Sequence, residues 1–323
     1  MLKRILVTGA AGGFGAALVS RLAARDDVRV VAFDLRPPGR AVPTGAEIVR
    51  GDIRDLDAVV DAMRGCDVVA HLAWVVGSMH DEPARREIDL GGTANVLEAM
   101  SATGCGRLVF ASSVTAYGSV PDHPAPYTES DPLQTEQPSR YAAHKAHAET
   151  MIAAAGVEAV LPRAAVVVGR AVDNAVRTVF AAPVIAAVRG DDMRVQVVHH
   201  DDVGRFYAEA CVGTRTGPVN LAAADVIGIE EAATILGKRL VRLPISALEA
   251  FVRATWFMRL GAMDPGEFNS MRYLPIVDAS RLHDEWGFAP EYSTVAALAD
   301  FRIALDRVIG VGRFTVPRRA RRA

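Results

Sequence analysis

The chain has 323 residues, and half of them are hydrophobic, so it can form one large domain or two smaller ones around a substantial core. Its formal net charge at pH 7 is −2, which excludes the strongly basic surface typical of nucleic-acid-binding proteins. No stretch reaches the roughly 20 apolar residues of a membrane span. The N-terminus opens into a predicted strand rather than a signal peptide, and the three cysteines lack metal-ligand spacing. We therefore expect a cytoplasmic protein without nucleic-acid or membrane partners.

The N-terminal residues predict a dinucleotide-binding turn. Residues 2–8 have the composition of a buried strand, and they run into a turn with glycines at positions 9, 12 and 15. Gly9 allows a tight turn, Gly12 lets backbone N–H groups approach a pyrophosphate, and Gly15 lets the next helix pack closely on the strand. A helix over 14–25 and a strand over 28–34 follow, and this strand ends in Asp34 at the distance that the motif expects.

Strands and helices alternate through the first half of the chain. This order is typical of right-handed βαβ units that build a parallel sheet covered on both faces. We therefore expect an α/β fold with a Rossmann-type doubly wound sheet. The strands are predicted at 2–8, 28–34, 46–50, 67–72, 107–112 and 157–168, and the helices near 14–25, 55–64, 82–103 and 139–155.

After about residue 170 the predicted elements become shorter. We expect an NAD-binding domain over 1–170, a smaller α/β substrate-binding cap over most of 171–310, and a basic tail over 311–323. Segment 193–212 is expected to return to the first domain, with Val195–Val198 joining the main sheet, and the amphipathic stretch Ala247–Met263 to be a cap helix. Helices are predicted near 175–189, 201–212, 229–236 and 245–262, and strands near 194–199, 217–222 and 238–243.

A serine, a tyrosine and a lysine carry the predicted chemistry. Tyr141 and Lys145 are four residues apart on a predicted helix, so both side chains project from one face. A nearby ammonium lowers a tyrosine pKa from its usual value of about 10 and so favours proton transfer. Ser113 follows the strand 107–112, at the same sheet edge as the glycine turn. Together with a dinucleotide, these residues indicate hydride transfer at a carbinol carbon.

Several histidines invite a functional interpretation that we do not favour. We expect His144 and His147 to face solvent or a partner helix. The run 199–202, His-His-Asp-Asp, looks like a metal cluster, but we predict no metal site. The residues after the fourth strand either line the substrate pocket or merely cover it; they are Trp74, Ser78, Met79 and His80.

From Val7 to about Phe301 the sequence resembles the extended short-chain dehydrogenase/reductase family of NAD-dependent sugar-nucleotide epimerases and dehydratases. The motifs that carry the resemblance are the glycine turn Thr8–Gly15, Gly51–Asp55, His71–Trp74, Gly92-Thr93, Ser112–Gly118, Tyr141-x-x-x-Lys145 and His199–Val203. The resemblance also implies a homodimer, paired through the helices 82–103 and 139–155. It further implies that the segment 199–202 ends a strand and begins a helix, with Asp201 or Asp202 as the N-cap.

The same resemblance assigns a role to each matching residue. Asp34 would bind both ribose hydroxyls and repel a 2′-phosphate, which favours NAD over NADP. The implied catalytic triad is Ser113, Tyr141 and Lys145. The implied cofactor contacts are Gly9, Gly12, Gly13 and Phe14 at the pyrophosphate, Asp34 at the adenosine ribose, Asp52 and Ile53 beside adenine, and Leu72 and Ala73 along the cofactor.

Departures from the family pattern narrow the reaction. Val114 and Thr115 stand where the 4,6-dehydratases carry an Asp-Glu pair, which excludes dehydration by that route. Val166 stands where many sugar-nucleotide enzymes carry an asparagine that contacts substrate, and Asp89 also replaces an asparagine.

We expect an NAD-dependent enzyme that oxidises a secondary alcohol, and three hypotheses for its function stay open. The leading one is a nucleotide-sugar epimerase-like reaction through a keto intermediate. The main alternative is a dehydrogenase or reductase of an apolar alcohol or ketone of sterol or aryl type. The third is a protein that senses NAD(H) without catalysis.

Overall fold

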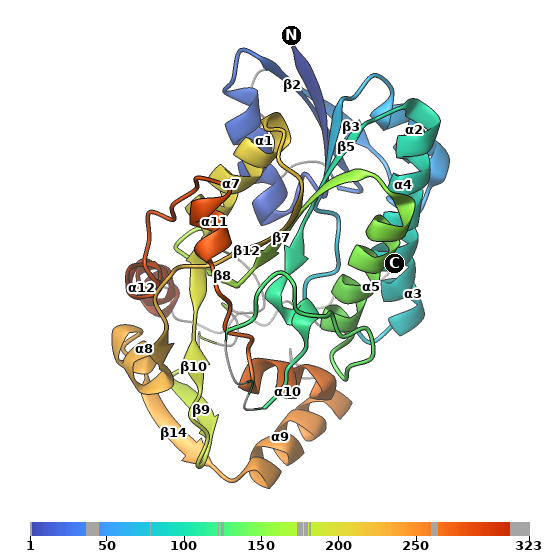
Figure 1. Cartoon of the computed structure of the whole chain (residues 1–323). Helices are drawn as coiled ribbons and strands as arrows, with labels where there is room; N and C mark the ends of the chain where they lie inside the picture. Colours follow the sequence, from blue (N-terminus) through green and yellow to red (C-terminus); the bar gives the residue numbers. More distant parts are fainter. Residues whose placement is uncertain are drawn as a thin grey trace.

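The computed structural model describes residues 2–36, 45–77, 79–121, 123, 126–172, 177, 180, 182–259 and 264–310. Its centre is a parallel sheet in the order β12-β7-β5-β4-β1-β2-β3, with β6 paired to β7 (Figure 1). These strands are β1 (Lys3–Thr8), β2 (Val28–Asp34), β3 (Ala46–Arg50), β4 (Val68–His71), β5 (Arg107–Phe110), β6 (Ser112–Ser113), β7 (Glu158–Ala164) and β12 (Gly217–Leu221).

Helices cover both faces of this sheet, which confirms the predicted Rossmann-type fold (Figure 1). Every residue of β4 and β5 is buried, as expected for strands covered on both faces. One face carries α1 (Gly13–Ala23) and α7 (His200–Val212), and the other carries α2 (Leu56–Met63), α4 (Gly92–Thr103) and α5 (Arg140–Ala155).

Polar caps and glycines set the ends of these helices. Asp55 caps α2 and Ser139 caps α5, each by accepting a hydrogen bond from a backbone N–H of the first turn. Gly104 and Gly156 end α4 and α5 in the left-handed conformation. The predicted helix 82–103 is continuous but contains a π-helical segment, Glu87–Gly91, between α3 (Glu82–Arg86) and α4.

Where the structure describes it, the second half of the chain adds three small two-stranded sheets and a third hydrophobic cluster. Figure 1 shows α9 and α10 together at the end of the molecule that lies away from the chain's N-terminus. The strand pairs are β8 (Val166–Val168) with β11 (Val197–His199), β10 (Arg194–Val195) with β13 (Ile227–Gly228), and β9 (Val184–Val188) with β14 (Arg239–Leu243). The helices are α8 (Ile229–Ile235), α9 (Ile245–Phe257), α10 (Pro265–Arg272), α11 (Ser280–Asp284) and α12 (Thr294–Gly310).

Two predictions for this half are wrong in detail. Residues 195–198 do not join the main sheet, because β11 pairs with β8, and Gly217–Leu221 forms the edge strand beside β7 instead. Helix α7 does pack on α1, as expected for a segment that returns to the N-terminal part of the chain. The helix predicted over 175–189 includes a strand, β9, in which branched residues pair with β14.

The helix predicted over 245–262 ends at Phe257 in the structure. The described residues do not include 260–263 or 311–323, and the predicted basic tail therefore lies outside them. Within the described chain, no helix combines the length and the apolar character that crossing a membrane requires.

A buried polar network ties α5 to the sheet beside the glycine turn. Arg163 on β7 donates to Glu149 on α5, with Nη2 and Oε2 2.7 Å apart, and both side chains are buried. The Ser112 hydroxyl on β6 also donates to Glu149. Arg163 Nη1 donates to the Tyr117 hydroxyl at 2.8 Å, which in turn donates to Asn220 on β12 at 2.7 Å. One helix and three strands are therefore fixed relative to one another.

Replacing Glu149 should destabilise the protein strongly. Glu149→Ala leaves the Arg163 guanidinium buried without its charge partner, which costs about 3–5 kcal/mol of unfolding free energy. Urea unfolding of the variant measures this loss. Glu98→Ala, at an exposed position on α4, is the control and should stay close to wild type. Equal stability of the two variants would contradict a structural role for the network.

Candidate active site

A cavity of about 570 Å³ opens at the carboxyl ends of the central strands. Its lining comes from the glycine turn, from the ends of β2, β4 and β6, from α5 and from the cap. The structure thus brings together on one cavity every residue predicted for the site: Gly9, Gly12, Gly13, Phe14, Gly15, Asp34, Asp52, Ile53, Leu72, Ala73, Ser113, Tyr141 and Lys145.

The glycine turn has the close packing that a dinucleotide cradle needs. Gly9 has a φ of +70°, and a Cβ there would lie 2.7 Å from the Ala73 backbone nitrogen. A Cβ at Gly15 would lie 2.8 Å from Ala10 Cα, so only glycine lets α1 pack this closely on the turn. At Gly13, the first residue of α1, a Cβ would meet no atom within 4 Å. The open helix N-terminus can therefore receive a pyrophosphate.

Asp34 lies where an adenosine ribose would be held. Its Oδ2 accepts from the Ala11 N–H at 3.0 Å and its Oδ1 from the Arg36 N–H at 2.9 Å. A carboxylate has about four acceptor positions, so two remain for ribose hydroxyls. Further along the lining, Arg54 pairs with Asp52 at 2.5 Å, and this hydrogen bond lowers the Asp52 pKa. These residues fit the predicted dinucleotide.

Ser113 and Tyr141 line the cavity together, and the Ser113 side chain interacts with the Tyr141 hydroxyl. Burial raises the pKa of the Tyr141 hydroxyl to about 12, and the bond to Ser113 opposes this rise. Ser113 Oγ accepts from the Thr115 backbone N–H at 3.2 Å and from the Thr115 hydroxyl at 3.0 Å, so its own proton can be donated. The pair is arranged to bind an oxygen and to exchange a proton with it.

Lys145 is buried beside this pair. Its Nζ donates to the Ala111 carbonyl at 2.5 Å and lies 3.4 Å from the centre of the Trp74 ring. Burial lowers the Lys145 pKa to about 7, although the charges of Asp89 and Glu149 raise it. Trp74 therefore lines the cavity and holds the lysine, whereas His80 stacks on Trp256 of α9 and Ser78 lies outside the described residues.

His144 does not face solvent but faces a neighbouring helical segment, which is one of the two placements predicted for it. Its side chain is buried, with Nδ1 3.0 Å from Asp89 Oδ2 and Nε2 3.4 Å from Glu82 Oε1. Asp89 also accepts from the Val75 N–H at 2.9 Å and lies 3.5 Å from Arg85 Nε. Asp89 on the π-helical segment and Glu82 on α3 thus hold the His144 side chain and tie α5 to these two elements.

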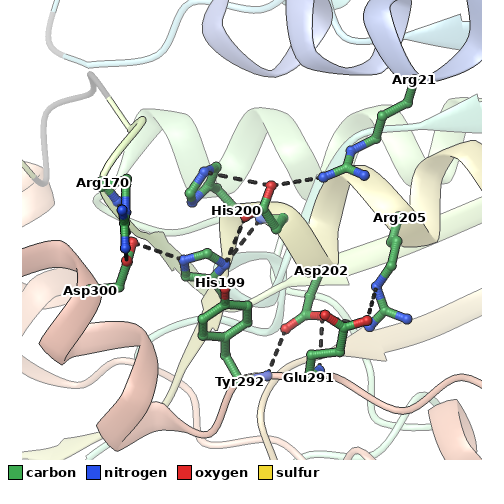
Figure 2. Close-up of polar contacts among 10 residues, drawn as sticks. Arg21, Arg170, His199, His200, Asp202, Arg205, Glu291, Tyr292 and Asp300 are labelled. Atoms are coloured by element: carbon green, nitrogen blue, oxygen red, sulfur yellow. Dashed lines mark hydrogen bonds and ion pairs between the residues drawn. The ribbon is translucent and has the colours of Figure 1, made fainter. Parts of the chain in front are cut away.

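His199, rather than Asp201 or Asp202, caps α7. Its Nδ1 accepts from the Asp201 backbone N–H at 3.3 Å. Figure 2 shows the His199 ring beside Asp300 and Tyr292. His199 Nε2 lies 3.1 Å from Asp300 Oδ2, and the centres of the His199 and Tyr292 rings are 3.6 Å apart. The prediction failed because a histidine acceptor is an uncommon cap, while aspartate is a frequent one.

The carboxylates around His199 bind protein groups. Asp202 accepts from Arg205 at 2.6 Å and from the backbone N–H of Glu291 at 2.9 Å, which fastens the segment before α12 (Figure 2). His199, His200 and Asp300 offer ligand atoms within 4.8 Å of one another. Both nitrogens of His199 already have partners, however, and Arg170 binds Asp300 through its Nε at 2.7 Å and through its backbone N–H at 2.8 Å. This bonding argues against a metal centre there.

The structure adds cavity-lining residues that the sequence analysis missed. Tyr207 and His200 reach the cavity from α7, and Glu267, Ser270 and Leu274 reach it from α10 and the residues after it. Of these residues, His200 lies in the motif His199–Val203, whereas no sequence pattern marks the others as cavity residues.

Lys145 should destabilise the cofactor-free protein in a pH-dependent way. Between pH about 7 and pH about 10.4 the unfolded chain binds a proton at Lys145 that the folded chain releases, so stability is lost as the pH falls through this window. Lys145→Met should therefore raise the melting temperature at pH 7, and the gain should shrink toward pH 10. Thermal melts followed by circular dichroism measure both. Lys238→Met on the cap is the control, and an equal gain at all pH values would contradict the account.

The comparisons with known proteins agree with this geometry. The model of the NAD-dependent epimerase/dehydratase family matches residues 5–207. An uncharacterized protein of Mycobacterium tuberculosis is 36% identical over 314 residues, which cover 97% of this chain and 31% of that protein, so the chain spans about a third of that relative's length. The UDP-glucose 4-epimerase of Streptomyces lividans is 38% identical over 159 residues, 47% of each chain.

Solved structures give the same result for the fold. The UDP-glucose 4-epimerase of Thermus thermophilus, in complex with NAD, is 25% identical with a TM-score of 0.73, and the match covers 94% of this chain and 99% of that one. The UDP-glucose 4-epimerase of Thermotoga maritima has a TM-score of 0.74 at 18% identity, over 95% of this chain and 99% of that one. Since the family model covers well over half of the sequence, the chain belongs to the NAD-dependent epimerase/dehydratase family, and its cofactor is NAD.

Proposed function

We propose that this chain is an enzyme that oxidises a secondary alcohol carbon, or reduces the corresponding ketone. The observation that carries the proposal is the single cavity lined by the glycine turn, Asp34, Ser113, Tyr141 and Lys145. NAD, when bound, supplies the hydride acceptor. Gly9, Gly12, Gly13 and Asp34 would hold it, and the substrate would occupy the end of the cavity beside Tyr141.

Each residue of the triad has a separate task. Tyr141 removes the hydroxyl proton, and Ser113 donates a hydrogen bond to the same oxygen. Lys145, whose Nζ lies 5.7 Å from the centre of the Tyr141 ring, would favour the tyrosinate when it is protonated. A protein that only senses NAD(H) has no use for a buried lysine beside a tyrosine and a serine, so the triad favours catalysis.

The cavity lining bears on the choice between the two reactions left open. Val166, Val167 and Leu274 give it apolar walls. Among the described lining residues the arginines are Arg36 and Arg54, and both lie beside the carboxylates Asp34 and Asp52. An epimerase must keep its keto intermediate bound while the other face of the carbonyl group turns toward the reduced cofactor. If the substrate is held through a nucleoside diphosphate during this turn, the diphosphate needs cations beside it.

We therefore favour a dehydrogenase or reductase of an uncharged, largely apolar alcohol or ketone, which releases its product and the reduced cofactor. A nucleotide-sugar epimerase is the second candidate, and the similarity to UDP-glucose 4-epimerases supports it. We also propose that the chain divides near residue 170 into an NAD-binding part and a cap. The homodimer and the cytoplasmic location stay predictions.

Tyr141→Phe should reduce turnover by at least about a thousandfold, because the proton acceptor is lost, while the affinity for NAD stays within about threefold. Initial rates and calorimetric NAD binding measure the two effects. Tyr127→Phe is the matched control, since its hydroxyl is buried without a hydrogen-bond partner among the described residues and lies outside the described cavity lining. Wild-type turnover in Tyr141→Phe would contradict the mechanism.

Asp34→Ala should weaken the preference for NAD over NADP by about tenfold or more. The variant loses two hydrogen bonds to ribose hydroxyls and the charge that repels a 2′-phosphate. Fluorescence titration with both reduced cofactors gives the ratio of dissociation constants. An unchanged ratio would show that Asp34 does not read the ribose.

A further inference from the structure

The cap presents two polar side chains to the substrate end of the cavity. Glu267 and Ser270 are three residues apart on α10, and both line the cavity together with Tyr141. The remaining carboxylates in the described lining, Asp34 and Asp52, lie beside Arg36 and Arg54 at the cofactor end. Glu267 is thus the acidic group among the described residues that faces the substrate end.

Glu267 is held firmly against the start of the catalytic helix. Its Oε2 accepts from the Ser139 hydroxyl at 2.8 Å, and its Oε1 accepts from the Tyr141 backbone N–H at 3.4 Å. The preceding residue, Gly266, lets the backbones approach closely, since a Cβ there would lie 3.0 Å from the Pro138 carbonyl carbon. The carboxylate is therefore fixed beside the side chain that we propose as the proton acceptor.

These contacts leave acceptor positions free. A carboxylate has about four, and the protein uses two of them. A hydroxyl group on the substrate can donate to a remaining position, whereas a phosphate or a carboxylate is repelled by the ionised form of Glu267. Burial raises the pKa of Glu267, while the hydrogen bond from Ser139 and the charge of Arg85 lower it and so favour the ionised form. Ser270 lies 6% exposed on the same helix face and can donate or accept beside it.

We propose that Glu267 and Ser270 form a second recognition point, which binds a further hydroxyl group of the substrate close to the reacting carbinol carbon and excludes anionic substrates. The proposal rests on the proposed function and specifies its substrate class as an uncharged compound with at least two hydroxyl groups. Nucleoside diphosphate sugars fall outside this class.

The test measures binding rather than turnover. UDP is titrated by calorimetry into the NAD-loaded wild type, into Glu267→Gln and into Glu231→Gln, whose carboxylate is exposed on α8. Glutamine keeps an acceptor for Ser139 but removes the charge. UDP should bind Glu267→Gln at least tenfold more tightly than wild type, and Glu231→Gln should match wild type. Equal affinity in all three, or no binding in any, would overturn the exclusion of anions.

A second experiment tests whether the site binds a further hydroxyl group of the substrate. Cyclohexanol and trans-cyclohexane-1,2-diol are compared as ligands of the same three proteins and of Ser270→Ala. The wild type should bind the diol roughly tenfold or more better than the mono-alcohol, and Glu267→Gln should lose most of this ratio. A wild type without a diol preference would overturn the second recognition point. Loss of turnover in Tyr141→Phe tests the proposed function separately, because neither binding arm depends on catalysis.

Discussion

The buried ion pair between Arg163 and Glu149 is the interaction on which the site depends. Glu149 lies one helical turn after Lys145 on α5, and it also accepts from Ser112, the neighbour of Ser113. Arg163 pairs in register with Ser112 across β6 and β7. One carboxylate thus fixes the distance between the strand that carries the serine and the helix that carries the tyrosine and lysine.

The same region contains buried ionisable side chains, which lower the stability of the folded protein. Lys145 is buried against Trp74 with a lowered pKa, and Tyr141 has a raised one. A further buried cluster lies where α5 meets α3 and the π-helical segment, and it consists of Arg85, Asp89 and His144. Burial of this kind costs stability and is typical of catalytic sites, where groups must be able to change protonation state. The well-bonded pair of Arg163 and Glu149 supplies the rigidity that such a site needs.

The sequence predicted the parts of the fold that follow local rules. The glycine turn, the apolar strands of the main sheet and the tyrosine–lysine spacing depend on neighbours in the chain, and the structure places them as expected. The rest depends on tertiary contacts. Burial of His144 comes from charges 55 and 62 residues away in the sequence, the strand β9 exists because β14 pairs with it, and Glu267 reaches Tyr141 only because the cap folds back on α5.

The most direct measurement of the central claim is the absorbance at about 340 nm, where the reduced nicotinamide absorbs, of the NAD-loaded protein mixed with a panel of uncharged secondary alcohols and of UDP-sugars. We predict accumulation of NADH with an uncharged alcohol and no response to UDP-sugars. Inversion of a UDP-sugar at one carbon, seen by NMR without net NADH, would contradict this prediction and establish an epimerase.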